Sequence, residues 1–561
     1  MKIHYTFYIY NSCKTSKHKK LNSYTIYMAA RSILAAFKEY EKSRLLFVQC
    51  MADTSTRAQC ADYLVDMHAI ELLLPLLSDI VPNIQVNAAL ALGNLANHKL
   101  SIAQTILDKG ILPVLFYDFN KKSKYFKKSA MFLLRCLAKH SADLAETIVT
   151  NRGLDIIIHC VDHLDPAIKE SAVWALGNIA KHNNQLARAV EKAGSIPLLI
   201  LCLQEPELCL KQVAVSALCD ISKHSIDLAQ SVMGAGGIPH LVKVLNNPDP
   251  KLKKKVFFTL GNICKHSLDL TETVVEADVM PVVFKHLLDS DPQVSRAAVM
   301  LIKEMVKHSL QMAHFVVDSG GLKPIIMIAS KNKGSIRLPA IITLGFIAGH
   351  SEPLALAVIE SQAVTELALI LMDDEEEDHV ISAAVWTVFC IGKHSPLHTR
   401  SITKTDIFAR LIQLLKSKKS SEDLKTKCKT TLKLCIHKCT DPEALEPLLK
   451  LATPEIFKHV ISQYSKILPI NASARRVFAA SGSLRMLQQI QPEPGSNLME
   501  HINIINSCFP EEMIRYYSPN YPESLLQQLD NYNPQIPTKI TPYKKSIDED
   551  LDPPTLPPSE Y

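Results

Sequence analysis

The sequence predicts an all-α protein, built as a right-handed superhelical solenoid of about eight to nine three-helix repeats with a helical C-terminal region. A histidine that returns every 42 residues carries this prediction, since a fixed period near 40 residues is typical of stacked repeats. The composition agrees: only 6% of the 561 residues are aromatic and Gly is scarce, as in helical arrays. The series comprises His98, His140, His182, His224, His266, His308 and His350, and His394 follows at 44.

The repeat that ends at His182 shows how each unit is built. Ser141 is a helix cap before a short first helix, and Gly153 is expected to end that helix in the left-handed conformation. A second helix follows over 154–164. Asp165-Pro166 then starts a long third helix, with Asp as the cap and Pro as the first helical residue. Its predicted buried stripe is Ile168, Ala172, Ala175, Leu176 and Ile179.

The same Asp-Pro helix starts and Gly joints recur once per repeat along the chain. Asp249-Pro250 and Asp291-Pro292 start other third helices, and the joints between first and second helices hold Gly110, Gly194, Gly236 and Gly320. Three helices in about 42 residues resemble the armadillo repeat. A two-helix repeat of similar length is the structural alternative, and the Gly joint after a short first helix favours the armadillo unit.

These signals divide the chain into five parts. We expect a disordered or spurious extension over 1–27, an N-terminal capping helix over 28–56 and armadillo repeats over 57–440. A helical C-terminal region over 441–532 and a disordered, Pro-rich acidic tail over 533–561 follow. The 14 Cys contain no CxxC pair and indicate a reducing, cytoplasmic compartment. No run of about 18 apolar residues predicts a membrane span, and a net charge of +6 is too small to argue for nucleic acid.

The periodic His suggests metal ligands, but stacking geometry opposes that interpretation. Neighbouring repeats lie roughly 10 Å apart, so one His per repeat cannot converge on a zinc ion. We expect instead that each His faces the negative end of its own third helix. The two extra residues between His350 and His394 fall in the acidic stretch 373–378, which is expected to be an exposed loop.

Lysines also recur with the repeat and predict a partner-binding groove. If the third helices line a concave surface, two lysine rows border it and would attract an extended acidic tail; a merely solvated face is the alternative. One row is Lys139, Lys181, Lys223, Lys265, Lys307 and Lys393, and the other is Lys127, Lys169, Lys211 and Lys253. Trp174 and Asn178 share this face and resemble the Trp-Asn array of nuclear-import adaptors, although the pair does not recur.

No catalytic constellation is apparent. A glycine-rich phosphate loop, GxSxG and HExxH are all missing, and His, Cys and Asp follow the repeat period. We therefore predict a protein that is not an enzyme and that needs no cofactor.

The segment after the repeats carries a more specific resemblance. It includes Leu445–Leu449, Ile456–Ile461, Ala474–Phe478, Glu493–Ser496 and Ile505–Pro519, and the likeness reaches back to Phe37–Lys42. Over roughly residues 30 to 532, the chain resembles the armadillo-repeat proteins of the central apparatus of motile cilia and sperm flagella. The resemblance implies a scaffold of the axoneme, in the cytoplasm and cytoskeleton, with central-apparatus proteins and microtubules as partners. A soluble adaptor for nuclear transport or signalling is the alternative.

Overall fold

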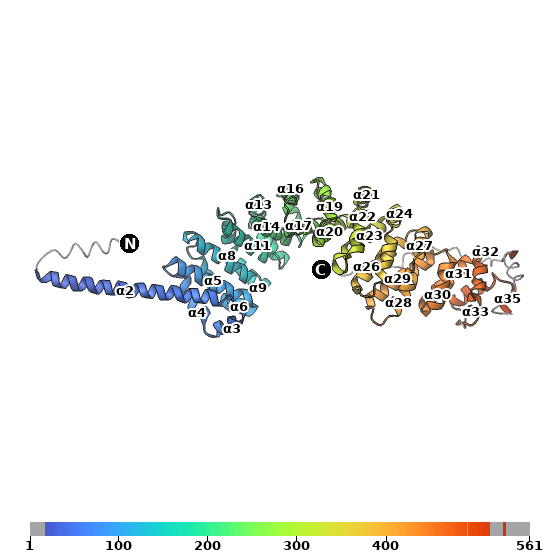
Figure 1. Cartoon of the computed structure of the whole chain (residues 1–561), viewed down its shortest axis with the longest axis horizontal. Coiled ribbons are helices and arrows are strands. Elements are labelled where there is room, and N and C mark those ends of the chain that lie inside the picture. Colours follow the sequence, from blue (N-terminus) through green and yellow to red (C-terminus); the bar gives the residue numbers. More distant parts are fainter. Residues whose placement is uncertain (1–16, 491, 516–530, 535–561) are drawn as a thin grey trace. The chain divides into compact units, whose positions relative to one another are not determined.

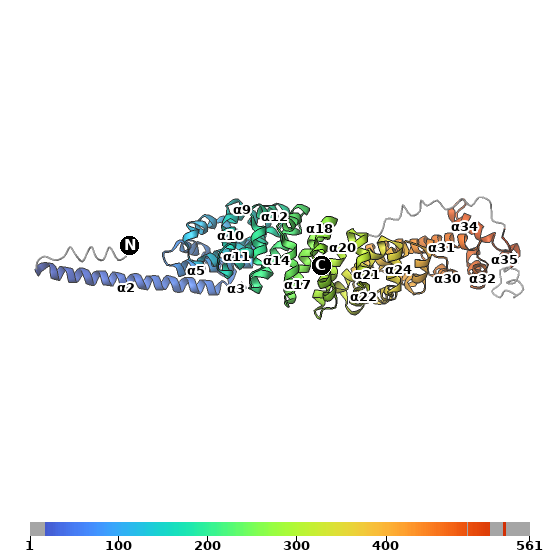
Figure 2. The ribbon, with the colours of Figure 1, turned by 90° about the horizontal axis from the view of Figure 1, so that it is seen from above.

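The computed structural model describes residues 17–490, 492–515 and 531–534, and no strand occurs in these ranges. The chain forms two compact units, Met1–Val244 and Leu245–Tyr561. Figures 1 and 2 show the helices of each unit stacked side by side. The all-α repeat fold predicted from the 42-residue period is confirmed.

The first unit begins with a long helix and continues with three-helix repeats. Helix α2 (Lys17–Thr54) packs on α5 through its C-terminal part, where Val48 is buried, while its N-terminal part extends away from the repeats (Figure 1). The following helices are α3 (Ala58–Asp66), α4 (Ala69–Leu73), α5 (Pro82–His98), α6 (Leu100–Asp108), α7 (Ile111–Phe116), α8 (Lys124–Ala138), α9 (Ala142–Thr150), α10 (Gly153–Val161), α11 (Pro166–Ala180), α12 (Asn184–Lys192), α13 (Ser195–Cys202), α14 (Leu208–Ser222), α15 (Ile226–Gly234) and α16 (Gly237–Val244).

The second unit continues the same pattern and adds the C-terminal helices. Its repeats comprise α17 (Pro250–Cys264), α18 (Leu268–Glu276), α19 (Met280–Leu287), α20 (Pro292–His308), α21 (Leu310–Asp318), α22 (Leu322–Lys331), α23 (Leu338–His350), α24 (Glu352–Glu360), α25 (Ala363–Met372), α26 (Asp378–Gly392), α27 (Pro396–Thr403), α28 (Ile407–Lys416) and α29 (Glu422–Lys438). The C-terminal helices are α30 (Pro442–Leu451), α31 (Pro454–Ile467), α32 (Ala472–Ala480), α33 (Ser483–Gln488), α34 (Asn497–Asn506) and α35 (Glu511–Arg515). Short 3-10 turns, η1 (Pro75–Ser78), η2 (Phe119–Lys121) and η3 (Gly334–Ile336), precede α5, α8 and α23.

The third helix of each repeat forms the core of the stack. Within the first unit, α5 packs on α8, α8 on α11 and α11 on α14; within the second, α17 through α29 pack in the same succession. The predicted stripe of α11 is buried throughout, from Ile168 to Ile179. Because each third helix contacts the third helices before and after it, the apolar core runs continuously within each unit.

The predicted helix starts are confirmed by their caps. The Ser141 side chain accepts a hydrogen bond from the Leu144 amide at 3.3 Å. Asp165, Asp249 and Asp291 likewise accept from amides of the first turns of α11, α17 and α20. These bonds satisfy amides that have no partner inside the helix. Gly110, Gly194, Gly236 and Gly320 have φ values of +72° to +79°, as expected at the joints.

The expectation for Gly153 is wrong. Arg152 takes the left-handed conformation at this joint, with φ of 60°, and Gly153 is already the first residue of α10. A Cβ at position 153 would lie 2.5 Å from Cγ2 of Ile148 and 2.7 Å from its carbonyl oxygen. Glycine is therefore needed here for close packing of α9 on α10.

The N-terminal boundary differs from the expected domain divisions. Helix α2 already begins at Lys17, inside the extension expected to be disordered, because no Pro or Gly interrupts the chain from Lys17 to Thr54. At the other end, α31 packs on α29 and α34 packs on α31, so the C-terminal helices extend the stack of the second unit. The tail beyond Pro534 and the end of the 505–519 motif lie outside the described residues.

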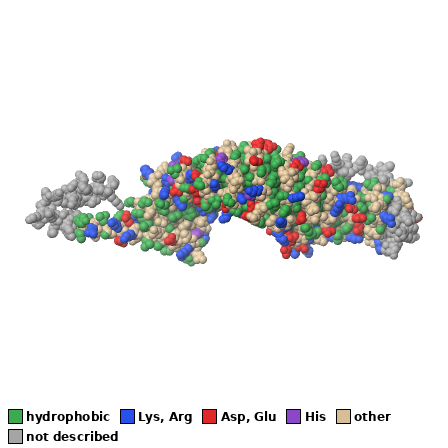
Figure 3. All heavy atoms as spheres, turned by 45° about the horizontal axis from the view of Figure 1, so that its top comes forward, with side chains coloured by type: hydrophobic (Ala, Val, Ile, Leu, Met, Phe, Trp, Pro, Cys, Tyr) green, Lys and Arg blue, Asp and Glu red, His purple; other side chains and the backbone are tan. Residues whose placement is uncertain are grey.

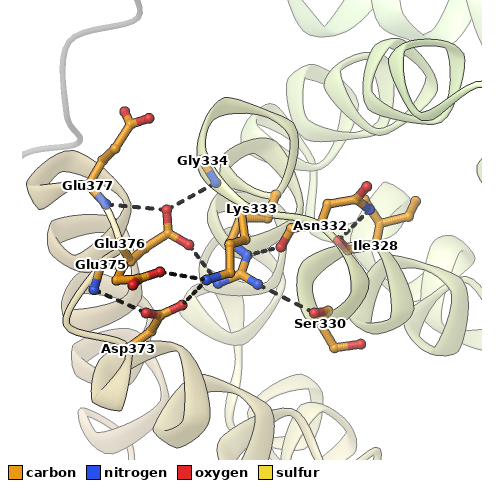
Figure 4. A network of polar contacts seen from close by, with 10 residues as sticks. Ile328, Ser330, Asn332, Lys333, Gly334, Asp373, Glu375, Glu376 and Glu377 are labelled. Atoms are coloured by element: carbon orange, nitrogen blue, oxygen red, sulfur yellow. Dashed lines mark hydrogen bonds and ion pairs between the residues drawn. The ribbon is translucent and has the colours of Figure 1, made fainter.

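The acidic stretch 373–378 is mostly exposed, as expected, but Glu376 is buried and three of its acidic side chains pair with the neighbouring repeats. Arg337 forms a buried ion pair with Glu376 at 2.7 Å, and Glu376 also accepts from the Gly334 amide at 3.0 Å. Lys333 lies 2.9 Å from Asp373 (Figure 4). On the other side, Arg410 pairs with Asp374 at 2.5 Å. The inserted loop, which we call the acidic clamp (Asp373–Asp378), thus links three successive repeats.

No single helix among the described residues has both the length and the apolar character to cross a membrane. Two bent pairs, α21 with α22 and α24 with α25, satisfy the length and composition test together, with bends of 85° and 71°.

Candidate partner-binding surface

The periodic histidines join consecutive repeats. The ring of His182 lies 2.7 Å from the carbonyl oxygen of Ala138, the last residue of the preceding third helix. Since a carbonyl can only accept, Nε2 carries the proton and donates. His182 therefore reaches the previous third helix, whereas the sequence predicts that it faces the end of its own. Equivalent bonds of 2.5–3.1 Å are made by His98, His140, His224, His308, His350 and His394.

This bonding leaves the histidines with a structural role. The carbonyls at a helix C-terminus have no partner within the helix, and each of these seven histidines supplies one across the repeat interface. Among the described residues, no group of three or more His, Cys, Asp or Glu is arranged to hold a metal ion. The described cysteines are free thiols, and burial raises the pKa of Cys160 to about 12, which keeps that thiol protonated.

The lysines at the C-terminal ends of the third helices come together in the first unit. Lys139 donates to the side-chain oxygen of Asn97 at 3.1 Å, and Lys223 pairs with Asp220 at 2.7 Å. Lys181 lies between them: burial lowers its pKa, Asp220 opposes this, and the positive charges of Lys139 and Lys223 lower it further. We call these three residues the lysine row; it is a local concentration of positive charge.

In the second unit the series of lysines at the ends of the third helices is interrupted. Lys265 and Lys307 continue the period, but Gly349 occupies the next position. The side chains of Cys390 and Lys393 lie beside Gly349, with the Nζ atom of Lys393 3.9 Å from where a Cβ would lie. Lys438, which ends the next third helix α29, donates to the Lys393 carbonyl at 2.6 Å. The later lysines therefore take part in packing between repeats as well.

The second predicted row is largely used inside the fold. Lys169 pairs with Glu205 at 2.5 Å, and Lys253 lies 3.7 Å from Asp289. In both pairs the acid belongs to the loop before the next third helix. Lys127 is only 8% exposed, and Lys211 is half-buried. These contacts explain why lysines occur at the start of third helices, where the helix dipole disfavours cations.

Trp174 and Asn178 both contact Arg135 of the preceding third helix. The guanidinium carbon of Arg135 lies 3.6 Å from the centroid of the Trp174 ring, a close cation–π contact. Asn178 donates to the Arg135 carbonyl at 3.1 Å. Trp174 remains 39% exposed, so the stacked pair lies at the surface of α8 and α11. Sequence reasoning found Trp174 and Asn178 but missed Arg135.

Comparison of equivalent positions in the repeats could have drawn attention to Arg135. Its position holds glycine in alternate repeats, at Gly93, Gly177, Gly261 and Gly345. At two of these positions a glycine accommodates an aromatic ring of the next repeat: a Cβ on Gly93 would lie 2.7 Å from Phe132, and one on Gly345 would lie 2.2 Å from Trp386, which is only 7% exposed. Arg135 replaces this glycine and lies against Trp174, whose ring is much more exposed than that of Trp386.

Charge elsewhere on the surface is mixed. On the face seen in Figure 3, basic and acidic side chains are interspersed with apolar ones. Recognition of a charged partner on that face would thus depend on local groups.

Comparison with known proteins decides the class of repeat. The armadillo/beta-catenin-like repeat matches residues 57–97, 141–181 and 225–265, three segments in register with the His series. The chain therefore has an all-α armadillo-repeat fold. Each matched segment runs from a first helix to the end of a third helix, and the unmatched segments between them have the same three-helix pattern.

Two curated relatives share sequence with this armadillo protein. Sperm-associated antigen 6 from Homo sapiens and from Mus musculus are each 48% identical over 165 residues, which is 29% of this chain and 32% of theirs. The chain thus matches about a third of the length of these close relatives. The crystal structure of an engineered protein aligns with a TM-score of 0.60 and 20% identity, covering 80% of this chain and 99% of that one. This last likeness concerns the fold alone.

Proposed function

We propose that this armadillo protein is a non-enzymatic scaffold of the axonemal central apparatus, required for the movement of cilia, flagella and sperm. The observation that carries the proposal is the 48% identity with sperm-associated antigen 6 over 165 residues. The repeat fold supports a binding role, because a stack of repeats presents an extended surface to protein partners.

Localisation tests this proposal directly. A tagged full-length chain expressed in multiciliated cells and in sperm should lie along the axoneme, between the outer doublet microtubules. Depleting it should disturb beating while cilia still assemble. A diffuse cytoplasmic or nuclear signal in motile cells, with normal beating after depletion, would contradict the proposal.

We further propose that the lysine row contacts the acidic tails of tubulin. Lys139, Lys181 and Lys223 concentrate positive charge, which attracts an acidic chain in a salt-dependent manner. Replacing all three with Glu should weaken co-sedimentation with microtubules. A matched control replaces Lys192, Lys243 and Lys285, which are exposed lysines on first and second helices. Equal pelleting with intact and tail-cleaved microtubules would reject this contact.

An adaptor that carries basic signals to the nucleus is the alternative function. In such adaptors the exposed Trp faces must be open to lysine or arginine side chains of the cargo. Here Arg135 already lies on the Trp174 ring, and its charge would repel a basic peptide. Titration with a lysine-rich peptide tests this alternative; tight binding at physiological salt would favour it over the scaffold.

A further inference from the structure

We infer that Arg135, held on the face of Trp174, is the anchor of an acidic-peptide site on α8 and α11. The inference deepens the proposed contact between the lysine row and acidic tails, and it rests on that proposal. It adds a residue that recognises carboxylates with a fixed geometry.

The first argument is orientation. Arg135 lies 3.6 Å from the Trp174 centroid and 5.6 Å from the Phe132 centroid, so aromatic rings hold its guanidinium group in place. Asn178 adds a hydrogen bond from α11 to the backbone of the same residue at 3.1 Å. A stacked guanidinium keeps its N–H groups at the edge of the plane, where they can donate two parallel bonds to one carboxylate.

The second argument is charge. Among the described residues, no carboxylate forms an ion pair with Arg135, whereas Lys169 and Arg188 on neighbouring helices have acidic partners. Lys139 follows Arg135 by four residues on α8, one turn further along the same face. Lys181 and Lys223 continue the positive charge across the next two third helices. An acidic peptide would meet one oriented guanidinium group followed by three ammonium groups, of which that of Lys223 is paired with Asp220.

The third argument concerns competing ligands. A nucleic-acid base would need an open aromatic face, and Arg135 covers the face of Trp174 that it contacts. A basic peptide would be repelled by the four cations. An acidic peptide has the complementary charge and does not need the ring to be uncovered.

Intrinsic fluorescence makes the site accessible to measurement, because the chain has only two Trp. Trp386 is buried, so a Trp386→Phe variant leaves Trp174 as the single reporter. The probe is a labelled octaglutamate peptide, with octalysine and an oligothymidylate as competitors. Affinity is measured by anisotropy on the full chain with both Trp present, and Trp174 emission is measured separately in the Trp386→Phe variant.

The variants separate orientation from net charge. Arg135→Gln should weaken octaglutamate binding about fivefold to tenfold, and Trp174→Leu should weaken it as well although no charge is lost. The matched control, Arg188→Gln, removes one positive charge from α12 and should change affinity less than twofold. Saturating peptide should change the emission of Trp174, since a carboxylate at Arg135 alters the charge on the ring face.

Three results would overturn the inference: unchanged affinity in Arg135→Gln, unchanged Trp174 emission at saturation, or tighter binding of octalysine or oligothymidylate. If the full chain still pellets with microtubules while Arg135→Gln binds octaglutamate normally, the inference fails and the tail contact stands. If the unmodified chain binds no octaglutamate, both fail, whereas localisation to the axoneme is judged independently.

Discussion

Seven histidines of the periodic series each make one hydrogen bond that the preceding helix cannot supply for itself. Ala138 is the last residue of α8, and its carbonyl accepts from His182 of the next repeat. The period of the His was visible in the sequence. Its partner was not, because a bond to a residue 44 positions earlier depends on how two repeats stack, which no local pattern shows.

Replacing His182 with Ala should therefore lower the free energy of unfolding by about 1–2 kcal/mol, because a half-buried carbonyl loses its partner. His308 is the internal control, since its side chain is exposed and its bond is longer, at 3.1 Å. His308→Ala should cost clearly less. Urea denaturation followed by circular dichroism measures both; equal losses would contradict a role set by burial of the bond.

Three histidines, one of them His394 of the periodic series, make the second unit sensitive to acid. Burial lowers the pKa of His394, His459 and His501, and that of His459 falls to about 4 with further help from the charge of Lys433. Between pH 6.5 and 4, the unfolded chain binds protons that the folded chain does not. By linkage, stability is greatest above pH 6.5 and is lost as the pH falls through this range.

His459→Asn should remove part of this dependence. Between pH 7 and pH 4.5, the free energy of unfolding of the variant should fall by about 1–2 kcal/mol less than that of the unmodified chain. This range allows for the solvent that reaches the half-buried ring. Urea midpoints at a series of pH values provide the measurement. Parallel pH curves for the two proteins would show that His459 does not carry the effect.

At the scale of the element, capping and apolar spacing were enough to place the helices. Asp165-Pro166 marked the start of α11, and the stripe from Ile168 to Ile179 marked its buried side. What they could not show was which residue at a joint adopts a positive φ, because that choice depends on the space beside it. At the joint before α10, Ile148 leaves room for no side chain at position 153, so Arg152 takes the strained conformation.

This joint predicts opposite effects for two neighbouring substitutions. Gly153→Ala should destabilise the protein by about 1–3 kcal/mol, because the new Cβ meets Ile148 at 2.5 Å. Arg152→Gly should stabilise it by up to about 1 kcal/mol, since glycine adopts a φ of 60° without steric cost. Thermal denaturation of both variants measures the pair. Stabilisation by Gly153→Ala would contradict this account of the joint.

At the scale of the whole molecule, stability is shared between neighbours in a stack. The acidic clamp shows this most clearly, because Glu376 is only 8% exposed and its pair with Arg337 crosses from one repeat to the next. The sequence marked this loop only as an insertion of uniform charge. The sequence could not reveal that two arginines neutralise part of this charge. Arg337 lies 39 residues before its partner Glu376, and Arg410 lies 36 residues after its partner Asp374.

Glu376→Gln leaves Arg337 with a buried, uncompensated charge, which typically costs about 3–5 kcal/mol. In a stack with nearest-neighbour coupling, this cost should appear locally. Hydrogen exchange should therefore accelerate in α22, α23, α25 and α26, while α8 and α11 exchange as in the unmodified protein. Glu375→Gln is the matched control, because its side chain is 88% exposed, and it should leave exchange nearly unchanged. Uniform acceleration along the whole chain would show instead that the repeats unfold as one cooperative body.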